Sequence, residues 1–143
     1  MGANDRLLFL ITVAQLAVKN YASKALSAAG AKVTLAQSGV LFLLAQRDRR
    51  MMSEIGGLLG IENSAMTGLI DRLEKSGLVT RNTDTDDRRA LFIGITPAGL
   101  EEARRAGRII RRVNDEIKTV CSEQELEDFK RVLEGILKKF GKA

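Results

Sequence analysis

The sequence predicts a mainly α-helical protein that carries one small β-hairpin. Its single proline, Pro97, leaves most of the 143 residues free to form helices. The alternation of apolar residues that is typical of a strand is clearest at residues 91–95. A chain of this length predicts one domain, 1–143. One set of apolar residues recurs at helical spacing: Met66, Leu69, Ile70 and Leu73.

Composition excludes several classes of function. The chain contains no histidine and a single cysteine, Cys121, which excludes histidine-based triads, histidine-ligated zinc and thiolate cages. We therefore expect no enzyme activity, no catalytic residue, no metal and no cofactor. The net charge of +5 favours an anionic partner, either nucleic acid or a membrane surface, and charge alone does not choose between them.

Two observations predict where the protein works. The apolar run at residues 7–18 is too short to span a bilayer, and the apolar pattern continues beyond it, which suits a helix better than a signal peptide. A single unpaired thiol fits a reducing compartment. We expect a cytoplasmic protein with no membrane partner.

Three helices are predicted in the first part of the chain. The first covers residues 5–28, is apolar on more than one side and ends at Gly30. The second starts with the capping box Thr34-Leu35-Ala36-Gln37 and runs to about residue 46. After a charged turn at 47–50, a Ser53 cap predicts a short third helix that runs to residue 59.

A fourth helix and a hairpin follow. The fourth helix carries the Met66 stripe, with Asn63 or Ser64 as its cap and Gly77 at its end. Two strands are predicted at residues 78–81 and 91–95. The residues between them are polar and charged, which indicates a hairpin with a long, charged tip.

Two more helices complete the chain. Thr96 is the expected cap of the fifth, with Pro97 at its first position, and this helix runs for about 24 residues. The capping box Ser122-Glu123-Gln124-Glu125 begins the sixth, which ends at Gly141. We expect the sixth helix to bury its apolar stripe: Leu126, Phe129, Val132, Leu133, Ile136, Leu137 and Phe140.

A short helix, a tight turn, an amphipathic helix and a charged hairpin, in that order, are typical of a winged helix-turn-helix, here at about residues 34–96. The fourth helix has an apolar back that can seat on the domain. Its opposite side is small and polar, so it can enter a major groove that is about 12 Å wide. Arg72 is long enough to reach a guanine edge or a phosphate. The candidate DNA-binding residues of this helix are Asn63, Ser64, Ala65, Thr67, Gly68 and Arg72.

Five stretches of the sequence carry a family pattern. They are Ser53-Glu54-Ile55, Leu59-Gly60-Ile61, Asp71-Arg72-Leu73-Glu74-Lys75-Ser76-Gly77-Leu78-Val79, Asp86-Asp87-Arg88-Arg89-Ala90 and Ile95-Thr96-Pro97-Ala98-Gly99. In this order the set strongly resembles the MarR family of winged-helix transcription regulators. The Asp-x-Arg pattern in the wing is its most diagnostic part.

The resemblance implies a homodimer that binds a pseudo-palindromic operator in double-stranded DNA. It places the fourth helix in the major groove and Arg88, with Arg89 beside it, in the adjacent minor groove. It pairs Asp86 with Arg72, and it assigns dimerisation to the helices at about 5–30 and 97–141. The expected function is that of a repressor, relieved by a small aromatic or anionic effector whose binding residues are unknown.

The charge distribution sets a condition on DNA binding. Residues 47–96 contain eight Lys/Arg and eight Asp/Glu, so this segment is formally neutral. DNA binding therefore requires Asp71 and Asp86 to face protein groups. It also requires the arginines of the segment to face phosphate: Arg47, Arg49, Arg50, Arg81, Arg88 and Arg89.

Two other functions stay open at this point. The winged helix can bind a protein instead of an operator, which predicts no steep salt dependence of DNA affinity. Cys121 can make the protein a redox-sensing regulator, although an inert thiol is favoured. The basic run of the fifth helix is interpreted as a solvated face: Arg104, Arg105, Arg108, Arg111 and Arg112.

Overall fold

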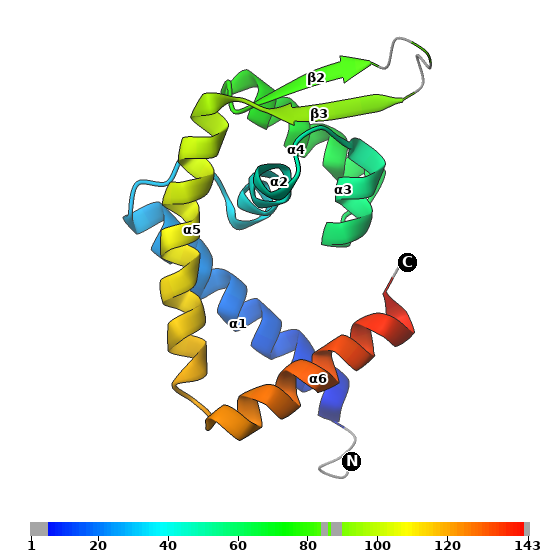
Figure 1. Cartoon of the computed structure of the whole chain (residues 1–143). Helices are drawn as coiled ribbons and strands as arrows, with labels where there is room; N and C mark the ends of the chain where they lie inside the picture. Colours follow the sequence, from blue (N-terminus) through cyan, green and yellow to red (C-terminus); the bar gives the residue numbers. More distant parts are fainter. Residues whose placement is uncertain (1–5, 84–85, 87–89, 142–143) are drawn as a thin grey trace.

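The computed structural model describes residues 6–83, 86 and 90–141 (Figure 1). In these residues the predicted order of helices and hairpin is confirmed, with one additional short strand. The elements are α1 (Leu7–Ala28), α2 (Leu35–Gln46), β1 (Arg50–Met51), α3 (Met52–Leu59), α4 (Asn63–Lys75), β2 (Val79–Thr83), β3 (Leu91–Ile95), α5 (Pro97–Lys118) and α6 (Glu123–Phe140).

Three predicted helix starts are confirmed. The Thr34 hydroxyl accepts the Gln37 N–H at 3.2 Å, while the Gln37 side chain accepts the Thr34 N–H at 2.9 Å. Ser122 and Glu125 form the same reciprocal pair at the start of α6. Thr96 caps α5 by accepting the Gly99 N–H at 3.0 Å. These starts are encoded locally, because both partners of each bond lie within three residues of each other.

Two predicted caps are wrong. Met51 is the N-cap of α3, so Ser53 lies inside the helix, and Glu62 is the N-cap of α4, so Asn63 and Ser64 lie in its first turn. Neither N-cap residue makes a side-chain cap hydrogen bond. Strand β1 runs directly into α3, so the sheet fixes where α3 starts. The polar side chains at the start of α4 are consequently not used as caps.

The sheet has three antiparallel strands in the order β1-β3-β2. Strand β1 was expected to be part of a charged turn. It pairs Arg50 with Ile93 and Met51 with Phe92, and two residues are too few to show an alternation in the sequence. Strand β2 pairs along its whole length with β3, from Val79↔Ile95 to Thr83↔Leu91.

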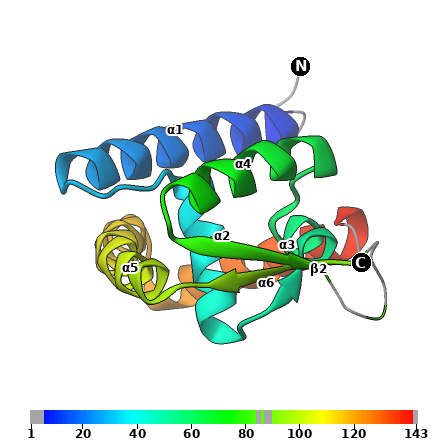
Figure 2. The same ribbon diagram turned by 90° about the horizontal axis from the view of Figure 1, so that it is seen from above.

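The core is built around α2, which contacts α1, α3, α4, α5 and β3 (Figure 1). Leu41, Ile55, Met66 and Ile93 are fully buried and come from four different elements. Seen from above, α4 and the hairpin lie next to each other, with α5 at one end (Figure 2). This core therefore fixes α4 and the wing as one unit.

The two outer helices are largely open in a single protomer. No residue of α6 is buried, so the prediction that α6 buries its stripe is wrong for one protomer: Leu137 is 68% exposed and Phe140 75%. The first turns of α1 are also open, and Leu8 is 79% exposed. None of the helices in the described residues combines the length and hydropathy that a membrane crossing requires.

Candidate nucleic-acid interface

Helix α4 separates a buried face from an exposed one. Met66, Ile70 and Leu73 are at most 1% exposed and anchor the helix on the core. On the other side, a Cβ built on Gly68 would meet no atom within 4 Å, so no described residue covers the helix at this point. The remaining candidate residues of α4 are all exposed: Asn63, Ser64, Ala65, Thr67 and Arg72.

A close approach of α3 to the turn before α4 supports this surface. A Cβ on Gly56 would lie 2.9 Å from the Ile61 carbonyl oxygen and 3.1 Å from the Met66 side chain, so only glycine fits there. Gly60 ends α3 with a left-handed φ of 69°. The turn leaves an open depression of about 480 Å³, lined by Ser53, Gly56, Gly57, Gly60, Ile61, Glu62, Asn63 and Ser64.

Arg81 connects the wing to α4. Its guanidinium pairs with Asp71 and lies 4.0 Å from Glu74, both on α4. Asp71 therefore faces a protein group, as expected, but the prediction that Arg81 faces phosphate is wrong. Arg81 pairs with Ile93 in the sheet register, which puts it on the inner face, and the alternation along β2 could have shown this.

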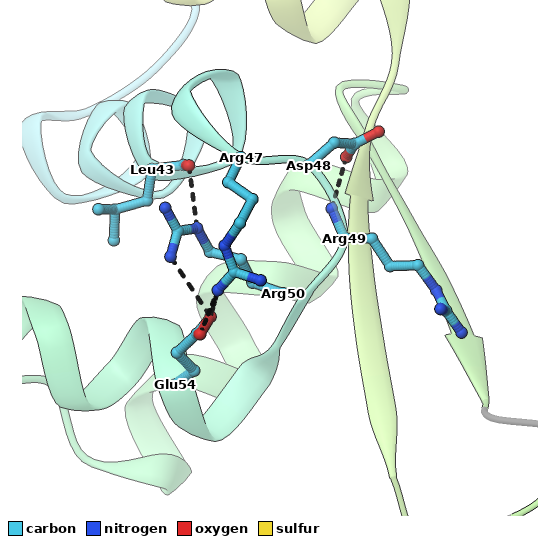
Figure 3. Close-up of polar contacts among 6 residues, drawn as sticks. All are labelled: Leu43, Arg47, Asp48, Arg49, Arg50 and Glu54. Carbon is cyan, nitrogen blue, oxygen red and sulfur yellow. Dashed lines mark hydrogen bonds and ion pairs between the residues drawn. The ribbon is translucent and has the colours of Figure 1, made fainter.

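A second set of ion pairs joins α2 to α3 (Figure 3). Arg47 donates to Glu54 Oε2 at 2.8 Å, and Arg50 lies 3.4 Å from the same oxygen. Arg50 also donates from Nε to the Leu43 carbonyl oxygen at 3.0 Å, and its side chain is only 11% exposed. The prediction that Arg47 and Arg50 face phosphate is therefore wrong, because both are paired within the protomer. The condition that every arginine of residues 47–96 faces phosphate is thus not met, and phosphate contacts of this segment fall to the arginines outside these ion pairs.

Arg49 differs from these three arginines. Its guanidinium lies 4.3 Å from the centre of the Phe92 ring, and no carboxylate of the described residues forms an ion pair with it. Arg88 and Arg89 lie outside the described residues. Asp86 is exposed, and its pairing with Arg72 stays a prediction.

Two other candidate features lie away from this surface. Cys121 is half-buried after α5, with its thiol 3.9 Å from the Lys118 carbonyl oxygen. In the part of the chain that the structure describes, no group of three acidic, cysteine or histidine side chains could hold a metal ion. The basic run of α5 is exposed at Arg104, Arg108, Arg111 and Arg112, whereas Arg105 is half-buried and donates to the Gly30 carbonyl oxygen at 3.4 Å.

The same segment matches a known protein family. The model of the MarR family matches residues 33–91, which hold α2, α3, α4 and the start of the wing. This match covers the helix-turn-helix segment and not the helices on either side of it. An uncharacterized HTH-type transcriptional regulator of Bacillus subtilis, YfiV, is 39% identical over 64 residues, which are 45% of this chain and 40% of that protein.

Two further comparisons extend the likeness. The HTH-type transcriptional repressor MdtR of B. subtilis is 37% identical over 67 residues, which are 47% of this chain and 43% of MdtR. The match thus spans less than half of either relative. The structure of the transcriptional repressor CouR bound to a 23-mer DNA duplex is 26% identical, with a TM-score of 0.84, and the match covers 93% of each chain. The chain is therefore similar to CouR across nearly its whole length.

Proposed function

We propose that this chain is a DNA-binding transcription regulator of the MarR family, and specifically a repressor that occludes its operator. The observation that carries the proposal is the open side of α4, where small polar residues and the uncovered Gly68 lie opposite a fully buried anchor. Such a side allows the helix backbone to approach base edges. The likeness to CouR, which is bound to DNA, supports the same use.

The working form is a homodimer, which α1 and α6 build from a second copy of the chain. A helix that is apolar on all sides requires neighbours on all sides, and one protomer leaves the first turns of α1 uncovered. The exposed apolar residues of the two helices are Leu7, Leu8, Phe9, Leu10, Ile11, Val13, Leu16, Val18, Phe129, Val132, Leu133, Leu137 and Phe140. A two-fold dimer would set two α4 helices about 34 Å apart, on successive turns of DNA.

Selection of bound fragments from the source genome, followed by affinity measurement over a range of salt, tests DNA binding. A steep fall of affinity with salt is expected. Replacement Arg88→Ala is expected to cost about 1–3 kcal/mol of operator binding without dissolving the dimer. Replacement Arg131→Ala is a matched control, because Arg131 pairs with Asp128 on α6. Unchanged affinity in Arg88→Ala would remove the wing from the mechanism, and salt-independent binding would favour a protein-binding module.

Relief by a small ligand completes the proposal. Two of the exposed aromatic side chains lie outside the apolar surface assigned to the dimer: Phe42 on α2 is 59% exposed and Tyr21 on α1 is 50% exposed. The Glu116 carboxylate, which accepts a hydrogen bond from the Tyr21 hydroxyl, raises the pKa of Tyr21 above its ordinary value of 10.0. Such rings offer a surface for an aromatic anion at the helices that join the dimer to the DNA-reading part.

Operator affinity measured with and without salicylate, used as a test aromatic anion, checks this step. A ligand lowers DNA affinity only if it binds the DNA-free arrangement more tightly, and couplings of roughly fivefold to 150-fold are typical. A fall of that size, reduced in Phe42→Ala, is expected. An affinity that stays constant at saturating salicylate would contradict the relief step while leaving operator binding intact.

A further inference from the structure

The outer face of the sheet carries an arginine held flat on an aromatic ring. Arg49 is exposed, and its guanidinium lies 4.3 Å from the centre of the Phe92 ring. Stacking uses the flat face of a guanidinium and leaves the N–H groups at its edge free to donate. Within the described residues Arg49 has no carboxylate partner. Its N–H groups are therefore left to solvent or to a ligand.

The backbone at Arg49 supports the same conclusion. Arg49 has a φ of 58°. In the described part of the chain, every other residue with a positive φ is a glycine. Asp48 holds this corner, because one of its carboxylate oxygens accepts the N–H of Arg49 at 2.8 Å and that of Ile95 at 2.9 Å. Glycine would adopt this backbone at lower energy. Arg49 therefore holds a backbone conformation that costs an arginine more than a glycine, and such strained positions are frequent at binding sites.

The register shows what lies around the stacked arginine. Phe92 pairs with Met51 on one side and with Asn82 on the other, so these three side chains share the outer face of the sheet. Asn82 and Met51 are exposed. Arg81 and Ile93 point to the opposite face, toward α4 and the core. The outer face therefore presents a fixed guanidinium beside the exposed amide of Asn82.

The position of Phe92 along the hairpin suggests which ligand Arg49 binds. Phe92 and Asn82 lie one residue pair back from Thr83↔Leu91, where the strands end and the wing loop begins. The minor groove is about 7.5 Å deep. When the loop of a hairpin enters the minor groove, the ends of the two strands lie level with the phosphates at the rim of the groove. We propose that Arg49, held on Phe92, binds a backbone phosphate beside the minor groove that the wing enters.

This proposal rests on the proposed DNA binding and adds one phosphate contact per subunit. It also bears on the neutral charge of residues 47–96. Arg47, Arg50 and Arg81 are paired with Glu54, Asp71 and Glu74. Among the described arginines of the sheet and of the turn before β1, Arg49 is therefore the one without a carboxylate partner. A phosphate contact fixes the position of the protein on DNA and reads no base.

The decisive variant is Arg49→Gly, because glycine suits the left-handed backbone while removing the guanidinium. Affinity for the selected operator is measured by fluorescence anisotropy from low to high salt, together with the melting temperature. We expect roughly tenfold weaker binding, a salt slope that is shallower by about 0.9 for each subunit, and a melting temperature equal to or above that of the wild type. Phe92→Leu should weaken binding less, because it keeps the charge and loses only the platform.

Arg47→Gln is the matched control, because it removes a neighbouring positive charge that is already paired with Glu54. Its salt slope should equal that of the wild type. If Arg88→Ala weakens binding and Arg49→Gly does not, this proposal fails while DNA binding stands. If the wild type binds no DNA, both fail. A lower melting temperature with an unchanged slope in Arg49→Gly would assign Arg49 a structural role and overturn the proposal.

Discussion

The part of the molecule between α2 and β3 and the two outer helices, α1 and α6, bury their apolar residues to different extents. Between α2 and β3, side chains such as Leu41, Met66 and Ile93 are completely buried within one protomer. Along α6 no side chain is buried, although the helix is strongly amphipathic in sequence. The first part closes its own core, whereas the second has an apolar stripe that only another surface can cover. Amphipathic sequence alone thus does not distinguish a core from an interface.

The largest effect is expected from substitutions in the apolar stripe of α6, which test whether another surface covers it. Replacing Leu133 and Leu137 with Gln keeps the helix but removes two apolar side chains from the stripe. A two-fold dimer loses four leucines, because each substitution is present in both copies. At about 1.5 kcal/mol per leucine, the dimer should lose about 6 kcal/mol of association free energy. Sedimentation equilibrium measures this loss. Glu134→Gln, on the polar side of α6, is the control, and an unchanged dimer in the double variant would exclude the stripe from the interface.

The next effect concerns adjacent residues of α4. Met66 is fully buried and Thr67 is exposed. We expect Met66→Ala to lower the free energy of unfolding by about 3 kcal/mol, whereas Thr67→Ala should change it by less than about 0.5 kcal/mol. Urea unfolding at several protein concentrations measures both. If Met66→Ala cost no more than Thr67→Ala, the closed core described for this part would be wrong.

Two neighbouring glycines of α3 test how closely this core is packed. A Cβ on Gly56 would meet the Ile61 carbonyl oxygen at 2.9 Å, whereas one on Gly57 would meet nothing within 4 Å. Gly56→Ala should therefore destabilise the protein by about 1–3 kcal/mol. Gly57→Ala should stabilise it by up to about 1 kcal/mol, because alanine favours the helix. Thermal unfolding compares the pair, and equal effects would contradict the close packing of α3 against the turn.

The smallest effect lies at the exposed start of α6. Hydrogen bonds from the backbone and side chain of Ser122 lower the pKa of Glu125 below its ordinary value of 4.5. A lowered pKa in the folded state stabilises the protein above pH 4.5, and this contribution disappears as the pH falls through the folded value. We expect Ser122→Ala to raise the pKa of Glu125, as followed by NMR titration. Its stability deficit should shrink in acid, and a deficit that does not depend on pH would contradict this account.

Much of the fold could be predicted because its signals are local. Thr34, Thr96 and Ser122 each start a helix through bonds to residues three positions away. The stripe of Met66, Ile70 and Leu73 likewise predicts the buried side of α4. Strand β1 could not be predicted, since its two residues become a strand only by pairing with Ile93 and Phe92, more than 40 positions later.

The candidate site was predicted only in part. The exposed residues of α4 follow from helical periodicity. The partners of the arginines do not, because Arg47, Arg50 and Arg81 look alike in sequence and differ only in which carboxylate the fold brings to each. The structure shows an ion pair between the wing and α4 that the sequence did not predict, Arg81 with Asp71. The pairing of Asp86 with Arg72 stays a prediction.

The sequence by itself determined where α2, α5 and α6 begin, which side of α4 is buried and which family motifs the chain carries, because these depend on spacing along a few turns. Only the tertiary structure decided that three arginines are neutralised, that Arg49 rests on Phe92 and that α6 remains open. Charge pairing and burial depend on distances between segments far apart in the chain, and those distances exist only once the chain has folded.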